Sequence, residues 1–110
     1  MGGIKMYKIA LLCEHGASTG LCVRKMIEAS EKLGIESEIG AYSILNIKDH
    51  LETKDWLLLG PQLSYKLDSL KAEYPECASK LSTVSPVDFG MMDGEKILKD
   101  VIELINKKEQ

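Results

Sequence analysis

The chain has no excess of positive charge and no long apolar run, and both absences exclude classes of function. Lysine and arginine number 14 against 17 aspartates and glutamates, which gives a net charge of −3. A chain with this balance has no overall field that attracts nucleic acid or an anionic membrane. Apolar stretches such as Trp56 to Leu59 are far too short to cross a bilayer. We therefore expect neither a nucleic-acid partner nor direct insertion into a membrane.

Cysteine is scarce as well, and its spacing excludes several kinds of site. The 110 residues contain only Cys13, Cys22 and Cys77. An odd number without a CxxC pair is not the pattern of a disulfide framework, a structural zinc site or a thioredoxin-type redox pair. The N-terminus also lacks the charged-then-apolar design of a signal peptide. These absences predict a cytoplasmic protein, and nothing in the sequence indicates a metal or another cofactor.

What the chain does have is the composition of one globular domain. Apolar residues make up 45% and charged residues 28% of the sequence, which are ordinary values for a folded soluble protein. A length of 110 residues allows one core without disulfide or metal staples. We expect a monomer with a single domain over residues 1–110, in which residues 1–5 form a flexible extension.

The period of the apolar residues changes back and forth along the chain. Compact apolar runs of strand length cover 6–13, 55–60 and 80–84, and residues 35–41 alternate as a half-exposed edge strand does. Helical spacing covers 22–33, 63–74 and 97–105, and more weakly 43–52. In the first of these, Cys22, Met26, Ala29 and Leu33 form one apolar stripe that we expect to be buried. Ser18 or Thr19 can cap the first helix and Asp93 the last, and Gly34 can end the first.

Strands that alternate with helices through short connections predict an α/β fold. The expected architecture is a three-layer sandwich around a four-stranded parallel sheet. Ligands of such sheets bind beyond the carboxyl ends of the strands. The segments at those ends are residues 13–20, 60–65 and 85–93, and we expect the functional site among them.

Cys13 ends the first apolar run and precedes a loop of small residues that leads into a helix. The expected phosphate-binding loop consists of Glu14, His15, Gly16, Ala17, Ser18, Thr19 and Gly20. Such a loop can turn several N–H groups inward, and the dipole of the following helix adds positive potential. The same field stabilises negative charge on a neighbouring sulfur. The pattern indicates a phosphocysteine intermediate, although a cysteine at a strand end is also typical of a plain core position.

The absence of arginine and lysine from this loop separates two kinds of phosphate chemistry. Low-molecular-weight tyrosine phosphatases share the expected topology, with strand order 2-1-3-4, and place an arginine six residues after their cysteine. This chain has Thr19 there, and it contains no Asp-Pro pair to serve as a general acid. Without a guanidinium group, transfer of phosphate to water should be slow. The loop is therefore expected to accept a phosphoryl group and pass it on.

Three segments resemble one known family. They are Cys13-x-x-Gly16-x-Ser18-Thr19, Gly60-Pro61-Gln62-x-x-Tyr65 and Asp88-x-Gly90-Met91-Met92-Asp93-Gly94-Glu95. In this order they are similar to the lactose/cellobiose group of IIB components of the bacterial phosphoenolpyruvate-dependent sugar phosphotransferase system. The resemblance implies a phosphotransferase component whose Cys13 takes a phosphoryl group from a phosphohistidine of a IIA protein. It also implies transfer to a cellobiose-, lactose- or chitobiose-like disaccharide bound by the membrane component IIC, which the protein meets only transiently.

Two alternatives remain at this point, namely a Cys-dependent phosphatase-like enzyme and a regulatory binding module with an inert Cys13. Glu14 and His15 depart from the small residues that the family commonly has there, which bears on substrate and partner choice. The further candidates for the cleft or partner surface are Leu21, Gln62, Tyr65, Met91 and Met92. Cys22 is expected in the core, Cys77 as an incidental thiol in a polar loop, and His50 at the surface.

Overall fold

The computed structural model describes residues 5–14 and 16–109. Of the expected N-terminal extension, residues 1–4 lie outside this part of the chain, as does His15 of the expected loop. Lys5 is described, and its ammonium group contacts the carboxylate of Glu109 near the other end of the chain.

Four strands form one parallel sheet. They are β1 (Tyr7–Cys13), β2 (Ser37–Ser43), β3 (Trp56–Leu59) and β4 (Leu81–Thr83). Their order is β2-β1-β3-β4, which confirms the predicted fold class and the predicted edge position of β2. The register places Ile9 beside both Ile39 and Trp56, and Leu57 beside Leu81. Cys13 therefore ends one of the two central strands.

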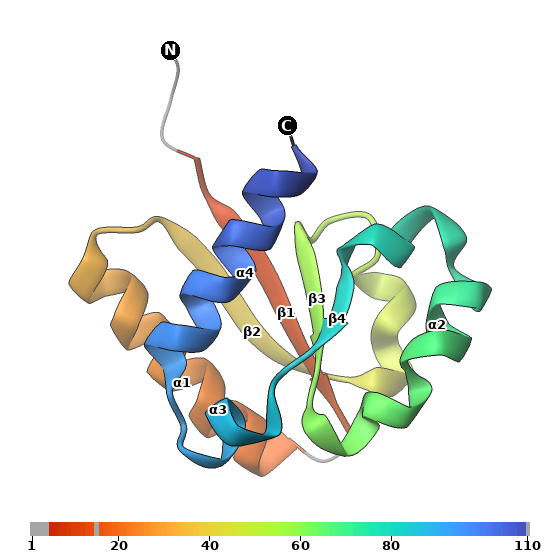
Figure 1. The fold of residues 1–110 in the computed structure, drawn as a ribbon, viewed down its shortest axis with the longest axis horizontal. Helices are drawn as coiled ribbons and strands as arrows, with labels where there is room; N and C mark the ends of the chain where they lie inside the picture. The colour runs from red at the N-terminus through yellow and green to blue at the C-terminus, as the bar shows by residue number, and fades with distance from the viewer. Residues whose placement is uncertain (1–4, 15, 110) are drawn as a thin grey trace.

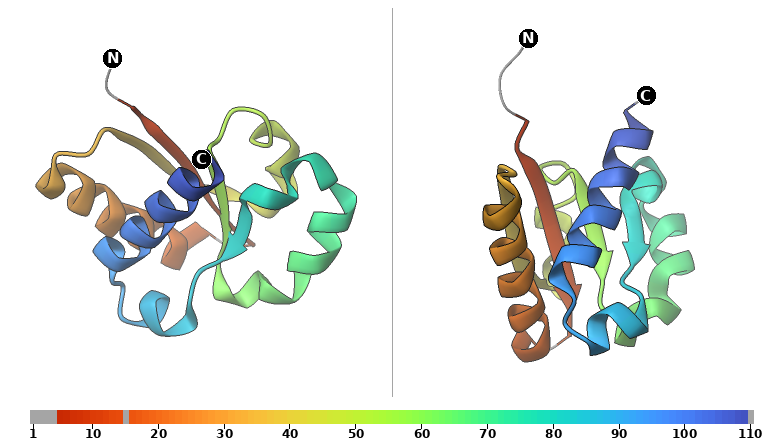
Figure 2. Two further views of the ribbon diagram at one scale, coloured as in Figure 1. Left: turned by 45° about the horizontal axis from the view of Figure 1, so that its top comes forward. Right: turned by 60° about the vertical axis from the view of Figure 1, so that its left-hand side comes forward.

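Helices cover both faces of this sheet (Figures 1 and 2). The α-helices are α1 (Gly16–Leu33), α2 (Leu67–Glu73), α3 (Pro86–Gly90) and α4 (Gly94–Lys108), and the 3₁₀ segments are η1 (Ile44–Asp49), η2 (Pro61–Lys66) and η3 (Pro75–Lys80). Buried side chains of α1, α3 and α4 pack on one face, and those of η1, η2 and α2 pack on the other. The predicted three layers are present.

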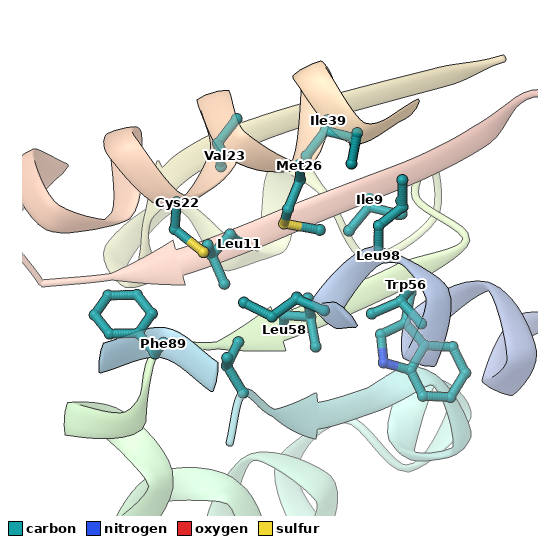
Figure 3. Close-up of a cluster of buried hydrophobic side chains, with 14 of the residues drawn as sticks. Ile9, Leu11, Cys22, Val23, Met26, Ile39, Trp56, Leu58, Phe89 and Leu98 are labelled. Carbon is teal, nitrogen blue, oxygen red and sulfur yellow. The ribbon is translucent and has the colours of Figure 1, made fainter. Parts of the chain in front are cut away.

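Alternate residues of the central strands supply two separate cores. Ile9, Leu11 and Leu58 face the layer of α1, α3 and α4, where Figure 3 shows them among Cys22, Met26, Phe89 and Leu98. Ala10, Leu12, Leu57 and Leu59 face the opposite layer. Successive side chains of a strand point to opposite faces. This explains why β1 and β3 are apolar at every buried position, whereas the edge strand β2 alternates.

Both ends of α1 were assigned from single residues, and the structure confirms only one assignment. Gly34 has φ +71° and follows the last helical residue, as a left-handed helix terminus requires. The prediction that Ser18 or Thr19 caps the start is wrong, because the helix already begins at Gly16. At the other helix with a predicted cap, the Asp93 side chain accepts a hydrogen bond from the Lys96 N–H, which confirms the cap of α4.

Three further predictions need correction. Leu33 was assigned to the buried stripe of α1 but is 37% exposed, because it lies in the last turn of the helix. Cys77 is not in a polar loop: it lies in η3, is buried, and its thiol donates to the Leu51 carbonyl at 3.6 Å. The single helix expected over 63–74 is divided into η2 and α2.

Candidate functional site

Cys13 lies at the carboxyl end of the sheet, where α1, η2 and α3 all begin (Figure 1). Its neighbours across the sheet are Ser43 on β2 and Gly60 directly after β3. The side chain is 6% exposed, and its thiol donates a long hydrogen bond to the Tyr42 carbonyl at 3.9 Å. The segments that follow the four strands all leave the sheet at this same edge, as the topology predicts.

The N-terminus of α1 comes three residues after Cys13. The first N–H groups of a helix have no partner inside the helix, and the helix dipole makes this end positive. An anion beside Cys13 can therefore be bound by backbone N–H groups without a basic side chain. This geometry is compatible with the predicted anion binding, but the N–H donors belong to the start of α1 and not to a loop.

The expected seven-residue loop is much shorter in the structure. Residues 16–20 belong to the first turns of α1, so the connection after Cys13 consists only of Glu14 and residue 15. Glu14 is exposed. Thr19 is 2% exposed, so its hydroxyl is not open to a protein partner. The prediction that residues 14–20 form a loop is therefore wrong for residues 16–20, which are helical, whereas their role in phosphate binding stays a prediction.

The segment after β3 runs beside the end of β1, where Cys13 lies. The Gly60 N–H donates to the Leu12 carbonyl at 3.0 Å, which extends the hydrogen-bonded ladder past the end of β3. Gln62 and Tyr65 both lie in η2 and are exposed. The Lys66 ammonium lies 5.7 Å from the centre of the Tyr65 ring. The structure thus brings this predicted pair to the edge of the sheet that holds Cys13.

Exposed apolar side chains gather on the segments at this edge. Leu21 is 40% exposed, as the helical stripe of α1 predicts, and Met91 is 73% exposed. Met92 differs: it is half-buried and packs against the core. Leu45 in η1 and Val87 in α3 are also highly exposed, and sequence reasoning missed both. The Ser85-Pro86 pair, a helix cap followed by proline at the first helical position, was a usable signal for α3.

The other two cysteines have different surroundings. Cys22 is fully buried in the first core, and this burial raises the pKa of its thiol to about 11. It therefore stays a neutral thiol near physiological pH. In the described part of the chain, no group of three histidine, cysteine or acidic side chains could hold a metal ion. Across the same residues, no helix is long and apolar enough to span a membrane.

A surface groove of about 620 Å³ lies away from this edge. Leu33, Ile35 and Ile102 line it, together with Lys99, Glu103, Asn106 and Lys107. Leu33 ends α1, whereas Cys13 precedes its start, so the length of a helix of about 27 Å separates the groove from the cysteine. The groove is therefore not part of the Cys13 site.

Comparison with known proteins identifies the family of this chain. Residues 8–100 match the family model of the phosphotransferase system (PTS) lactose/cellobiose-specific IIB subunit. The oligo-beta-mannoside-specific EIIB component of Bacillus subtilis is 33% identical over 100 residues, which cover 91% of this chain and 97% of that protein. The residues that the family model matches include Cys13 and the segments after β3 and β4.

Solved structures share the fold. The cellobiose-specific IIB component of Borrelia burgdorferi superposes with a TM-score of 0.81 at 25% identity, over 96% of this chain and 97% of that one. A low-molecular-weight protein tyrosine phosphatase from T. tengcongensis has a TM-score of 0.52 at 15% identity, covering 94% and 97% of the two chains. The phosphatase shows the fold alone, and it confirms the expected topology. On the family match and the curated relative, the chain belongs to the lactose/cellobiose-specific IIB subunits of the phosphotransferase system.

Proposed function

We propose that Cys13 carries the phosphoryl group of this phosphotransferase component. It takes the group from a phosphohistidine of a IIA protein and gives it to a sugar bound by the membrane component IIC. The observation that supports the proposal is the place of Cys13, which ends a central strand directly before the N-terminus of α1. A dianionic group on this sulfur would face unpaired N–H groups and the positive end of a helix.

The two steps of the proposed reaction are both displacements at phosphorus. In the first, the sulfur forms an S–P bond as the N–P bond of phosphohistidine breaks, and the electron pair returns to the imidazole nitrogen. The thiol proton leaves Cys13 in this step and passes to the released imidazole nitrogen. In the second, the sugar hydroxyl oxygen forms an O–P bond while the S–P bond breaks and leaves its electron pair on the sulfur. The proton of the hydroxyl passes to the sulfur, which restores the thiol of Cys13.

The absence of a basic side chain from the Cys13 loop suits a carrier. A guanidinium group would hold the phosphoryl dianion strongly and stabilise its transfer to water. Residues 14–23 contain neither arginine nor lysine. Neutral N–H donors hold the group less tightly, so it can move on to the next acceptor.

The proposed partners meet this carrier in turn at the Cys13 edge. Leu21, Tyr65 and Met91 are exposed there, and we assign them to the docking surface. Apolar contact around the reacting atoms excludes water during transfer, and a small interface allows rapid release. The proposed setting is the cytoplasm, with a monomeric carrier that reaches the membrane only through IIC and a disaccharide as the final acceptor.

Mapping of the phosphorylated residue tests the proposal. The protein is incubated with phosphoenolpyruvate, the general phosphocarriers and a IIA protein of this family, and then digested for mass spectrometry under conditions that preserve S–P bonds. One phosphoryl group on Cys13 is the expected result. Cys13→Ser should fold and fail to pass phosphate on, because a serine alkoxide is hard to form and its phosphate ester is a poor donor.

Three outcomes would contradict the proposal. Phosphate on Ser18, Thr19 or His15 would remove Cys13 from its role. Steady release of inorganic phosphate from an aryl phosphate would favour the phosphatase-like alternative. Complete absence of labelling by the phosphorylated IIA protein would favour a binding module with an inert Cys13.

A further inference from the structure

The side chain of Gln62 folds back over Gly60 at the end of β3. Its Oε1 atom lies 3.1 Å from the point that a Cβ atom on Gly60 would occupy, and the Leu12 carbonyl oxygen lies 3.6 Å from the same point. The missing side chain of Gly60 thus leaves room for an amide at the junction of β3 and β1. Since Gln62 is exposed, no core packing holds it there.

The ladder geometry shows that this amide lies on the same face as the Cys13 side chain. Leu12 pairs with Leu59, and the Gly60 N–H donates to the Leu12 carbonyl, so Gly60 stands beside Cys13. Leu11 and Leu58, two residues before these positions, both face the first core. Side chains alternate along a strand, so Cys13 and a Cβ on Gly60 point to that same face. A Cβ on Gly60 would therefore lie about one strand spacing, roughly 5 Å, from that of Cys13, and the amide oxygen lies beside that Cβ position.

We propose that the Gln62 side chain donates hydrogen bonds to the phosphoryl group on Cys13. The inference rests on the proposed function of Cys13 and adds a named ligand of its phosphoryl oxygens. The Nε2 group carries two N–H donors and no charge, and rotation of the exposed side chain brings it over the sulfur. Backbone N–H groups of α1 bind the phosphoryl group from one side, and Gln62 binds it from the side of β3.

A neutral donor fits the chemistry better here than a cation would. A hydrogen bond from a neutral amide to the charged phosphoryl oxygens is already stronger than one between neutral partners. A guanidinium group would add the attraction of a full opposite charge, and a carrier must release its cargo. The one arginine of the chain, Arg24, lies in the exposed middle of α1. Gln62 takes part in no covalent step: the S–P bond forms and breaks at Cys13, and the amide only orients the oxygens.

Substitutions at Gln62 and Gly60 test the inference through two independent routes. Loss of one hydrogen bond to a charged group should slow transfer from phosphorylated IIA to Cys13 by about tenfold to a hundredfold in Gln62→Ala. Gln62→Glu should be slower still, because a carboxylate repels the phosphoryl group. Gly60→Ala should show a smaller defect of the same kind, since its methyl group would lie 3.1 Å from Oε1 and push the amide aside by only a few tenths of an ångström, while φ −58° and ψ 154° suit alanine.

The matched control is Ser64→Ala, which removes another exposed polar side chain from the same 3₁₀ segment. It should transfer phosphate at the wild-type rate. The melting temperature of each variant is measured in parallel, and Gln62→Ala should melt with the wild type. If the transfer rates of the variants fall in step with their melting temperatures, and not with loss of the Gln62 amide, the inference is overturned.

A spectroscopic readout needs no variant. The side-chain N–H₂ signals of Gln62 in a ¹⁵N-labelled wild-type protein should shift strongly when Cys13 is phosphorylated. Unmoved signals in a protein that carries phosphate on Cys13, or a Gln62→Ala rate equal to that of Ser64→Ala, would overturn this inference and leave the proposed function intact. Failure of Cys13 to become phosphorylated would instead overturn the proposed function.

Discussion

At the scale of single residues, Cys13 differs from the other two cysteines in position and not in exposure. All three thiols are buried. Cys22 packs inside the first core, where its pKa is raised to about 11, and the Cys77 thiol donates to the Leu51 carbonyl. Cys13 alone of the three stands at the carboxyl end of a strand and before a helix N-terminus. Position in the fold, and not solvent access, makes it the candidate nucleophile.

Gly34 provides a test of backbone strain at one residue. Its φ is +71°, and a Cβ atom there would meet no heavy atom within 4 Å. Gly34→Ala should therefore add strain without a clash and lower the free energy of unfolding by about 1 kcal/mol. Urea unfolding followed by circular dichroism measures the difference.

Gly20→Ala is the matched control for that experiment. Gly20 lies inside α1, and a Cβ atom there also meets nothing within 4 Å. Alanine is the better helix former, so this change should stabilise the protein by about 0.5–1 kcal/mol. A Gly34→Ala protein as stable as Gly20→Ala would show that α1 does not end in a left-handed residue.

At the scale of elements, sequence patterns predicted which helices and strands exist better than where they begin. The stripe of Cys22, Met26 and Ala29 predicted the buried face of α1, and all three are buried. The start of α1 was missed because small residues at 16–20 are as compatible with a helix start as with a loop. Leu33 follows the same spacing yet is exposed, since a periodic pattern does not show where a helix runs past its sheet.

The sequence likewise predicted the location of the candidate site but not all of its side-chain contacts. A cysteine that ends an apolar run before a helix indicated the location, because carboxyl ends of parallel strands meet at one edge of the sheet. The position of Gln62 over Gly60 was not predictable, since it depends on the path of the chain after β3. The exposed Leu45 and Val87 were missed because sequence spacing assigns faces only within an element.

The exposed face of α1 carries the next prediction. Leu21, near the start of the helix, is 40% exposed, so Leu21→Glu should leave the melting temperature nearly unchanged. The added charge at the proposed docking surface should slow transfer from IIA to Cys13 by about tenfold or more, as loss of a central apolar contact does in other interfaces. Rates of ³²P transfer from labelled IIA provide the measurement.

Leu33→Glu is the control from the opposite end of the same helix. Leu33 is 37% exposed, which nearly matches Leu21, but it lines the groove far from Cys13. This variant should transfer at the wild-type rate. Equal defects in both variants would show that the proposed docking surface does not depend on proximity to Cys13.

Glu95 links α1 to α4 and makes their contact depend on pH. Its carboxylate lies 3.2 Å from Lys32 and 3.0 Å from Lys99. The hydrogen bond from Lys99, followed by that from Lys32, lowers the pKa of Glu95 below its ordinary value of 4.5. A carboxyl group with a lowered pKa stabilises the folded state above its unfolded value and loses this contribution as the pH falls through its folded value.

The Glu95→Gln variant should therefore melt slightly below the wild type at pH 7. The difference should shrink as the pH falls below 4.5 and disappear once the pH is below the lowered pKa of Glu95. Thermal melts across this pH range measure it. The contacts are exposed, so the difference should also shrink at 1 M salt. A gap between the two proteins that persists at low pH and high salt would show that packing, and not charge, accounts for it.

At the scale of the whole molecule, two cores share the same two central strands. Ile9, Leu11 and Leu58 belong to the first core, whereas Leu12 and Leu59 belong to the second. Neither layer of helices can detach from the sheet without exposing one face of β1 and β3 to solvent. We therefore propose that the described fold behaves as a single domain, with both layers unfolding together.

Cys22 and Cys77 are built-in probes of this cooperativity. Cys22 belongs to the first core, whereas the Cys77 thiol contacts Leu51, which packs against the second core on the opposite face of the sheet. Cys22 is 0% and Cys77 is 5% exposed, so each thiol should react with iodoacetamide only after its layer opens. A domain of ordinary stability populates the open state in about one molecule in a thousand or fewer. Alkylation at increasing urea, mapped peptide by peptide, should give one midpoint for both thiols, equal to that of the fluorescence of Trp56, which is buried on β3. Reaction of Cys77 at clearly lower urea than Cys22 would show that the layer containing η3 opens by itself and that the two cores are not one cooperative unit.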